Sequence, residues 1–155
     1  MRLAVGLWLG PWFLGVSAGL AYLATMLVFY LELGGFNYSQ HYSLLRAAGQ
    51  PIEPRHAWNQ LKPMSRSLSF EISNHSGHHL CPTRVCVELE PYPQAPRMPS
   101  IILCFLHAFS PTLWEGALAR SRLEQRDQHL ASDTERALAR QANKHARWPQ
   151  WLEPA

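Results

Sequence analysis

Hydrophobic and polar positions divide the chain into an apolar N-terminal segment and a mixed remainder. Residues 3–31 contain 22 apolar residues among 29 and no charged residue. A helix of that length would extend roughly 43 Å, whereas a bilayer core about 30 Å thick needs about 20 residues. The pattern therefore predicts one transmembrane helix. Glu32 and the pair Gly34 and Gly35 are expected to end it, because glycine is common just past a helix end.

A cleaved signal peptide is the alternative interpretation of this segment. Arg2 supplies a short positive region, and Val16, Ser17 and Ala18 match the small-residue pattern of a cleavage site. However, the apolar run is about twice as long as an ordinary signal-peptide core. An uncleaved anchor is therefore favoured, and a small secreted or lumenal binding protein remains the alternative.

Glycine spacing within the apolar segment indicates a helix–helix contact. Gly6 and Gly10 are four residues apart, as are Gly15 and Gly19. Small residues at this spacing allow two helix backbones to approach closely in lipid. We expect a contact with a second copy or with another membrane protein.

The middle of the chain has short apolar patterns of more than one kind. Residues 68–72 and 85–89 alternate apolar and polar side chains, which predicts a short β-hairpin. Four prolines within residues 91–99 then oppose regular structure. Residues 101–109 form a second apolar run that is too short to cross a bilayer. We interpret it as a buried strand or as a segment lying against the membrane surface.

Helices are predicted on both sides of this middle region. Short helices are expected over residues 39–48 and 53–61, where proline suits the first turn. The spacing of a capping box occurs twice, at Thr112 with Glu115 and at Ser132 with Glu135. It predicts two charged helices with little apolar face. Asp127 and Asp133 are expected on their solvated faces.

These patterns together predict a membrane-anchored, mainly α-helical protein with a weakly ordered middle. The predicted segments are an anchor, a pair of short helices, a Ser/Pro/His/Cys-containing region that is poorly ordered or a small β segment, and a charged helical tail. They cover residues 1–33, 34–64, 65–111 and 112–155.

Histidine and cysteine cluster within twelve residues in the middle region. The cluster consists of His75, His78, His79, Cys81 and Cys86. Imidazole and thiolate bind zinc or copper, but this order matches no standard ligand framework. No metal site is therefore predicted, and a membrane-tethered metal-binding module is kept as an alternative. In an oxidising compartment, Cys81 and Cys86 are candidates for a disulfide bridge.

Two glycosylation sequons bear on the cellular compartment. They begin at Asn37 and Asn74. In a protein with an uncleaved anchor, sequons that face the lumen favour a location in the endoplasmic reticulum or later secretory membranes. They also predict that the protein is a glycoprotein. The mitochondrial inner membrane is the alternative location.

The remaining sequence favours a binding role over catalysis. No nucleophile–base spacing or phosphate-binding loop is recognisable, and a net charge of +3 is too small to imply nucleic acid. We therefore predict a single-pass, non-enzymatic interaction or assembly subunit without a cofactor. Its expected partners are the lipid bilayer and another membrane protein or a second copy.

Overall fold

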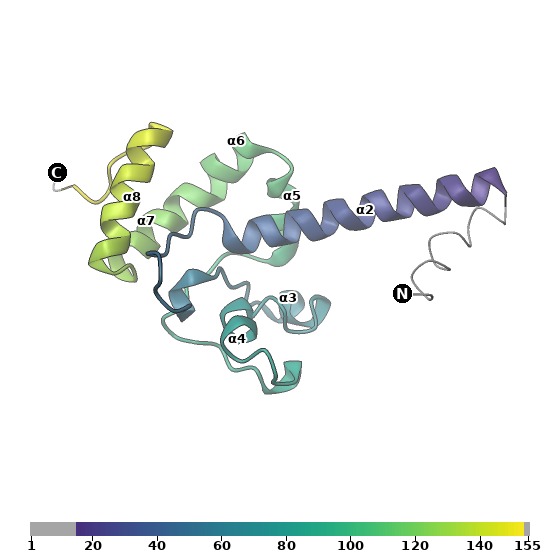
Figure 1. Cartoon of the computed structure of the whole chain (residues 1–155), viewed down its shortest axis with the longest axis horizontal. Helices are drawn as coiled ribbons and strands as arrows, with labels where there is room; N and C mark the ends of the chain where they lie inside the picture. The colour runs from purple at the N-terminus through teal and green to yellow at the C-terminus, as the bar shows by residue number, and fades with distance from the viewer. Residues whose placement is uncertain (1–14, 154–155) are drawn as a thin grey trace. The chain divides into compact units, whose positions relative to one another are not determined.

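The computed structural model describes residues 15–153, and the chain divides into two units, Met1–Gly35 and Phe36–Ala155. The described residues are mainly helical and contain no β-strand, so the predicted helical class is confirmed. In chain order the elements are α2 (Val16–His41), the 3₁₀ turn η1 (Pro54–His56), α3 (Pro63–Leu68), α4 (His75–Leu80), the 3₁₀ turn η2 (Cys86–Glu88), α5 (Ile101–Ala108), α6 (Pro111–Leu113), the π-helical segment η3 (Trp114–Ala119), α7 (Arg120–His129) and α8 (Asp133–Ala146) (Figure 1).

Helix α2 is the one described helix that is long and apolar enough to cross a membrane, judged by length and composition. Only 6% of its most apolar window is buried inside the structure. The helix does not stop at Gly34 and Gly35 but continues to His41. Glycine inside a helix costs only about 1 kcal/mol, and the last turn after it belongs to the larger unit, where its residues find partners.

The predicted β-hairpin is wrong. Residues 68–72 form the end of α3 and a turn in which Phe70 and Glu71 have positive φ angles of 49° and 68°. Local bonds close this turn: the Glu71 amide donates to the Arg66 carbonyl over 2.9 Å, and the Arg66 guanidinium donates to the Glu71 carboxylate over 2.7 Å. Residues 85–89 contain η2. Two isolated strands are marginal in water, so these local bonds prevail over the alternating pattern.

The second apolar run forms helix α5, and the interpretation as a buried strand is wrong. The Ser100 side chain accepts a hydrogen bond from the Leu103 amide, which caps the helix start. Ile101 and Cys104 are buried, whereas Ile102 and Leu106 are exposed. The run therefore covers the core with one face and leaves large apolar side chains on the other.

Two tryptophans organise the core of the larger unit. Trp58 and Trp114 are 1% and 0% exposed, and the Trp58 indole donates to the Tyr42 carbonyl over 2.9 Å. Backbone bonds between Asn59 and the segment around Arg97 form an isolated parallel bridge beside Trp58. The other buried members of this core are Met98, Cys104, Leu118, Ala119 and Leu123.

The two predicted capping boxes have different outcomes. Ser132 and Glu135 form the full box at the start of α8. Thr112 and Glu115 do not form one, because the helix begins two residues earlier than the pattern requires: its N-cap residue is Ser110 and not Thr112. Glu115 instead accepts a hydrogen bond from the Tyr42 hydroxyl over 3.0 Å.

A buried carboxylate joins segments that lie far apart in the chain. Glu135 is 2% exposed and accepts hydrogen bonds from Arg55 over 3.0 Å and from Arg126 over 3.1 Å, while the His56 ring nitrogen lies 2.6 Å from its other oxygen. Burial alone would raise the pKa of this carboxyl, but the bonds from His56, Arg55 and the Ser132 amide, with the charge of Arg126, lower it below its ordinary value. The helical tail is therefore not solvated on all sides.

We expect Glu135→Ala to destabilise the fold strongly. Arg126 is 1% exposed and would keep its buried charge while losing one of its partners, a kind of change that costs about 3 to 5 kcal/mol. Denaturant unfolding of detergent-solubilised protein measures the loss. The exposed Glu124 on α7 provides the control, and Glu124→Ala should change the free energy of unfolding by less than about 0.5 kcal/mol. Equal effects of the two variants would contradict the role of the buried network.

The same network makes stability depend on pH. Because the pKa of Glu135 is lower in the folded chain than in the unfolded chain, its contribution is complete above the ordinary carboxyl pKa. The contribution is lost as the pH falls through the folded value. The difference in unfolding free energy between the wild type and Glu135→Gln should therefore shrink on acidification from neutral pH. A difference that does not change down to acid denaturation would refute this assignment.

Candidate metal centre

Three histidine side chains from two separate elements converge in the larger unit. His41 ends α2, and His75 and His79 lie on α4. The Nε2 atom of His75 lies 2.9 Å from that of His41 and 3.0 Å from that of His79, and the three candidate ligand atoms all lie within 4.8 Å of one another. Three imidazole nitrogens around a common point form the arrangement that a first-row transition metal requires.

The local sequence explains two of the three positions. His75 and His79 are four residues apart, so they lie on the same face of α4. His78 is exposed, and its ring centre lies 6.0 Å from that of His75 and 5.8 Å from that of His79. It stays outside the convergent group. His41 comes from 34 residues earlier and completes the group from another element.

The protonation of His75 suits a metal ligand. The pKa of His75 is lowered to about 3, chiefly by burial and to a smaller extent by the neighbouring His79 and His41 rings. The pKa of His79 is also lowered, mainly by burial. The Ile72 carbonyl lies 3.3 Å from Nδ1 of His75 and can only accept a hydrogen bond. Nδ1 therefore carries the proton, and the Nε2 lone pair is directed toward the other two rings.

A buried asparagine holds the start of α4 in place. Asn59 is fully buried, and its side-chain oxygen accepts from the Ser76 amide over 3.0 Å while its nitrogen donates to the Ser76 hydroxyl over 2.8 Å. The Ser76 hydroxyl donates in turn to the Pro54 carbonyl over 2.6 Å. Ser76 directly follows His75, so these bonds set the position of that ring.

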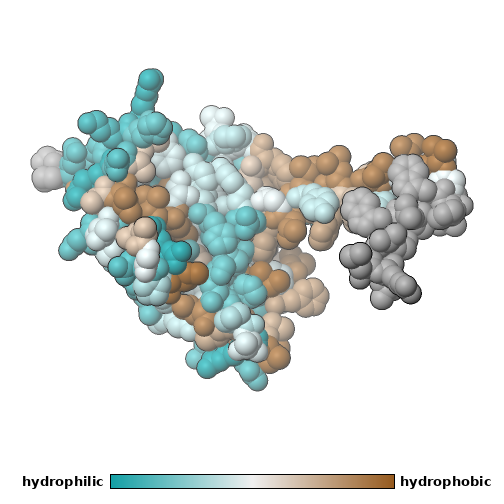
Figure 2. Space-filling model, in the orientation of Figure 1, coloured by the Kyte–Doolittle hydropathy of each residue, from teal (hydrophilic) through white to brown (hydrophobic). Residues whose placement is uncertain are grey.

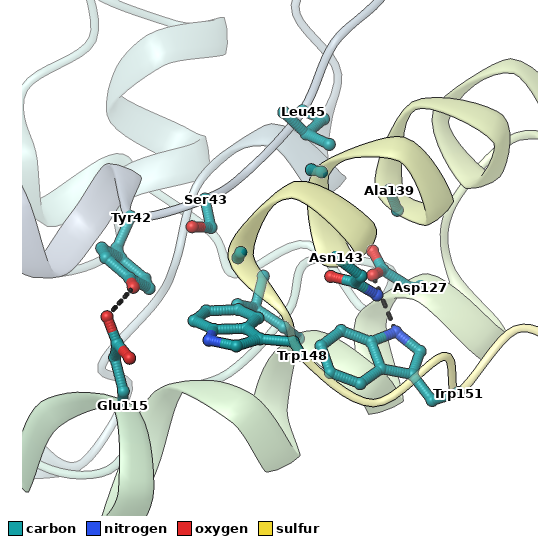
Figure 3. A pocket seen from close by; sticks show the side chains of 12 residues that line it. Tyr42, Ser43, Leu45, Glu115, Asp127, Ala139, Asn143, Trp148 and Trp151 are labelled. Carbon is teal, nitrogen blue, oxygen red and sulfur yellow. Dashed lines mark hydrogen bonds between the residues drawn. The ribbon is translucent and has the colours of Figure 1, made fainter. Parts of the chain in front are cut away.

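The residues on either side of His41 are also anchored. The side-chain amide of Gln40 donates to the Ile72 carbonyl over 3.3 Å, which ties the end of α2 to the turn before α4. The Tyr42 ring packs against Trp114, with centres 5.7 Å apart, and its hydroxyl donates to Glu115 (Figure 3). His41 is therefore held by contacts on both sides in the sequence.

A pocket of about 260 Å³ lies beyond Tyr42, against α8 (Figure 3). Trp148 and Trp151 flank it, and the Trp151 indole donates to Asp127 over 3.1 Å. Asp127 is 3% exposed and does not lie on a solvated face as predicted. The lining contains no histidine or cysteine. This pocket therefore offers no imidazole or thiolate ligand for a metal, and the candidate ligands lie at the three histidines.

The structure separates the cysteines from the histidines with which they cluster in sequence. Cys81 and Cys86 are both free thiols, so the predicted bridge between them remains without support. The Cys81 sulfur lies 3.7 Å from the Tyr92 hydroxyl, and Cys86 is exposed. The sequence cluster includes His75 and His79, but its spacing led to no predicted metal site. Nothing in the spacing points to His41, because its partner histidines follow in a different element.

The other predicted site residues take no part in the convergent group. Asn74 is fully buried and its side-chain amide donates to the Leu89 carbonyl over 3.1 Å, which does not suit a glycosylation acceptor. Asn37 is exposed on α2. Gly6 and Gly10 lie outside the described residues, Gly15 directly precedes α2, and Gly19 lies in its first turn. The glycine-mediated helix contact stays a prediction.

Comparison with known proteins gives a consistent set of relatives. The model of the fatty acid desaturase family matches residues 1–102. The chain is 43% identical over 139 residues to the xylene/toluene monooxygenase hydroxylase component XylM of Pseudomonas putida, an alignment that covers 90% of this chain and 38% of XylM. It is 33% identical over 98 residues to alkane 1-monooxygenase 1 of Alcanivorax borkumensis, covering 59% of this chain and 24% of that protein. The chain thus spans less than two fifths of the length of these relatives.

These similarities correct the functional predictions made from the sequence. The relatives are monooxygenases by name, so the prediction of a non-enzymatic interaction or accessory subunit is wrong, as are its alternatives of a secreted binding protein and a tethered His/Cys module. The description as a single-pass glycoprotein is not supported. The relatives come from bacteria, which have no endoplasmic reticulum or mitochondria, and a membrane location is the part that remains.

We expect the three histidines to bind a divalent transition-metal ion together. Loss of a direct ligand in His75→Ala or His79→Ala should lower affinity for iron(II) or cobalt(II) by more than about 100-fold, since even the partners of ligands contribute 10- to 100-fold. Metal titration of the purified protein measures this. His129 lies exposed on α7, and His129→Ala should bind as the wild type does. Unchanged affinity in the α4 variants would exclude the site.

We expect Asn59→Ala to weaken metal binding without removing a ligand. The start of α4 would lose both side-chain bonds to Ser76, and the affinity should fall about 10- to 100-fold. Asn143 on α8 is also buried, at 5% exposure, and lies outside the histidine group, so Asn143→Ala is the matched control. If the two variants alter affinity equally, Asn59 does not position His75.

Proposed function

Because the chain belongs to the fatty acid desaturase family, whose model matches residues 1–102, we propose that it is the metal-binding part of a membrane-bound oxygenase that hydroxylates a hydrocarbon C–H bond. The observation that carries this proposal is the convergence of His41, His75 and His79. Imidazole ligands suit iron and copper as well as zinc, and oxygenation requires a redox-active metal. Iron is the first candidate.

The bound ion would supply the activation of dioxygen, which amino-acid side chains do not provide. The residues of this chain hold and orient it. His41, His75 and His79 offer neutral nitrogen ligands, and the Ile72 carbonyl sets the tautomer of His75. Asn59 and Gln40 keep α4 and the end of α2 at a fixed separation. His78 is the nearest further imidazole on α4 that could serve as an additional ligand.

Several parts of a working enzyme are proposed to lie elsewhere in the protein. Three imidazoles are fewer ligands than iron takes in an octahedral site, and the chain corresponds to 38% of XylM. We expect further ligands and much of the substrate channel to come from segments that correspond to the rest of that relative.

The proposed reaction also requires electrons from another protein. Hydroxylation of a C–H bond by dioxygen consumes two electrons and two protons and yields one alcohol and one water. XylM is by its name the hydroxylase component of its monooxygenase. We therefore propose that this protein receives electrons from a separate electron-transfer component.

Desaturation is the second candidate function, since the family is that of fatty acid desaturases. It would consume the same dioxygen, two electrons and two protons, but one hydrogen from each of two adjacent carbons would leave with the oxygen atoms as two waters, and a double bond would form without insertion of oxygen. The 43% identity to XylM over 90% of this chain favours hydroxylation. By analogy with the names of the relatives, the proposed substrates are xylenes, toluene and alkanes.

A chimera provides a direct test of this function. The matched segment of XylM is replaced by the corresponding 139 residues of this chain, and membranes containing the chimera are supplied with an electron donor, toluene or an alkane, and isotopically labelled dioxygen. We expect labelled alcohol as the product. His75→Ala should abolish the product because a ligand is lost, whereas His129→Ala should retain it. A chimera that binds metal but forms only an alkene would favour desaturation, and one that forms neither product would contradict the proposal.

A further inference from the structure

Large apolar side chains are exposed on the larger unit along α3, α5, the residues that follow each of them, and the end of α6. Phe70 is 78% exposed, Met64 63% and Leu106 61%. We call this set the α3–α5 apolar surface. Its members are Met64, Leu68, Phe70, Ile72, Ile102, Leu103, Leu106, Phe109 and Leu113.

The two segments that carry this surface are held side by side. The Ile101 amide at the start of α5 donates to the hydroxyl of Ser65 in α3 over 3.0 Å, and both residues are buried. This bond connects the start of α5 to α3 on the buried side of both segments. Figure 2 shows hydrophobic surface over the α3 region, whereas the surface over α8 is mainly hydrophilic.

The α3–α5 apolar surface is bonded to a residue that closely follows the candidate membrane span in the sequence. The carbonyl of Ile72, one of its members, accepts a hydrogen bond from the Gln40 amide in the last turn of α2. Gln40 and Ile72 lie in the same unit, so their relation is fixed. If the apolar part of α2 crosses the bilayer, chain continuity alone keeps Gln40, and with it Ile72, only a few residues from the point where the chain leaves the hydrocarbon.

The kinds of side chain identify the occupant. Helices that pack against other helices in membranes use small residues such as Gly, Ala and Ser. The α3–α5 apolar surface instead consists of Met, Leu, Ile and Phe side chains, as in helices that lie in the bilayer interface. The exposed Lys62 precedes α3 and can approach anionic headgroups.

We propose that the α3–α5 apolar surface is embedded in the headgroup and upper acyl region of the bilayer, so that the larger unit lies on the membrane. Interfacial helices bury their apolar face about 5 to 10 Å into this region. His41 and His75 are tied to the same elements through Gln40 and Ile72. The histidine cluster is therefore held near the lipid surface, where a hydrocarbon can arrive from the acyl chains.

Site-directed spin labelling tests this placement. The full chain carries Cys81→Ser and Cys86→Ser and is reconstituted in vesicles of phosphatidylethanolamine and phosphatidylglycerol. A spin label is attached at Phe70→Cys or Leu106→Cys. The control label is at Arg140→Cys, on the exposed face of α8. Cys104 is fully buried and remains unlabelled. Collisions with oxygen, which concentrates in lipid, and with a water-soluble nickel chelate report the depth of each label.

We expect the oxygen-to-nickel collision ratio at Phe70 and Leu106 to shift toward that of lipid, and the ratio at Arg140 to remain that of water. A water-like ratio at all three sites would overturn the proposal. Suppressed collisions with both reagents at Leu106 would also overturn it, because a protein segment or a second copy would then cover the surface.

A charge on the same helix face distinguishes insertion from mere proximity. Ile102 precedes Leu106 by four residues on α5, so Ile102→Glu should return the Leu106 label toward the water-like ratio. Gln141→Glu, at an exposed position on α8, is the matched charge change away from the surface and should leave the Leu106 ratio unchanged. Retained metal binding in each labelled variant shows that the fold is intact, and equal effects of the two glutamate substitutions would overturn the proposal.

Discussion

The candidate metal centre depends on one constraint: the end of α2 must lie against the start of α4. The Gln40 bond to the Ile72 carbonyl and the close approach of His41 to His75 both express this constraint. No local preference of either helix brings them together. The contact is stabilised from outside, because Asn59 holds α4 while Tyr42 is packed against Trp114 and bonded to Glu115.

The C-terminal helices stabilise this arrangement from the opposite side. Glu135 at the start of α8 binds Arg55, which belongs to the segment that also contains Asn59. Arg126 on α7 binds the same carboxylate and donates to the Leu45 carbonyl. Two buried charges of opposite sign thus tie both flanks of the histidine group to the helical tail. Each one makes burial of the other tolerable.

The sequence predicts the features that depend on near neighbours. Apolar length indicates α2, the spacing of Ser132 and Glu135 indicates the start of α8, and the four-residue interval between His75 and His79 places them on one helix face. These features arise from bonds or contacts within a few turns. The family relationship was not evident from such patterns.

The features that the sequence does not predict depend on contacts between distant residues. His41 completes the site from 34 residues away, and no periodicity connects it to α4. Arg126 and Asp127 lie in a stretch that is polar enough to indicate solvent on every side, yet both are buried because their partners come from elsewhere in the chain. The hairpin prediction is wrong for the same reason in reverse, since a local turn with its own ion pair replaces the alternating pattern.

The separation of His41 from His75 also sets an order of assembly. During synthesis the chain emerges from its N-terminus, so α2 can enter the bilayer before α4 has been made. The residues between the two histidines contain only short helical elements, and closing such a loop costs conformational entropy that is recovered only when both ends are in place. The histidine site therefore forms only after α4 has been made and the residues between the two helices have folded. A chain cut short before α4 would carry His41 without its two partner imidazoles.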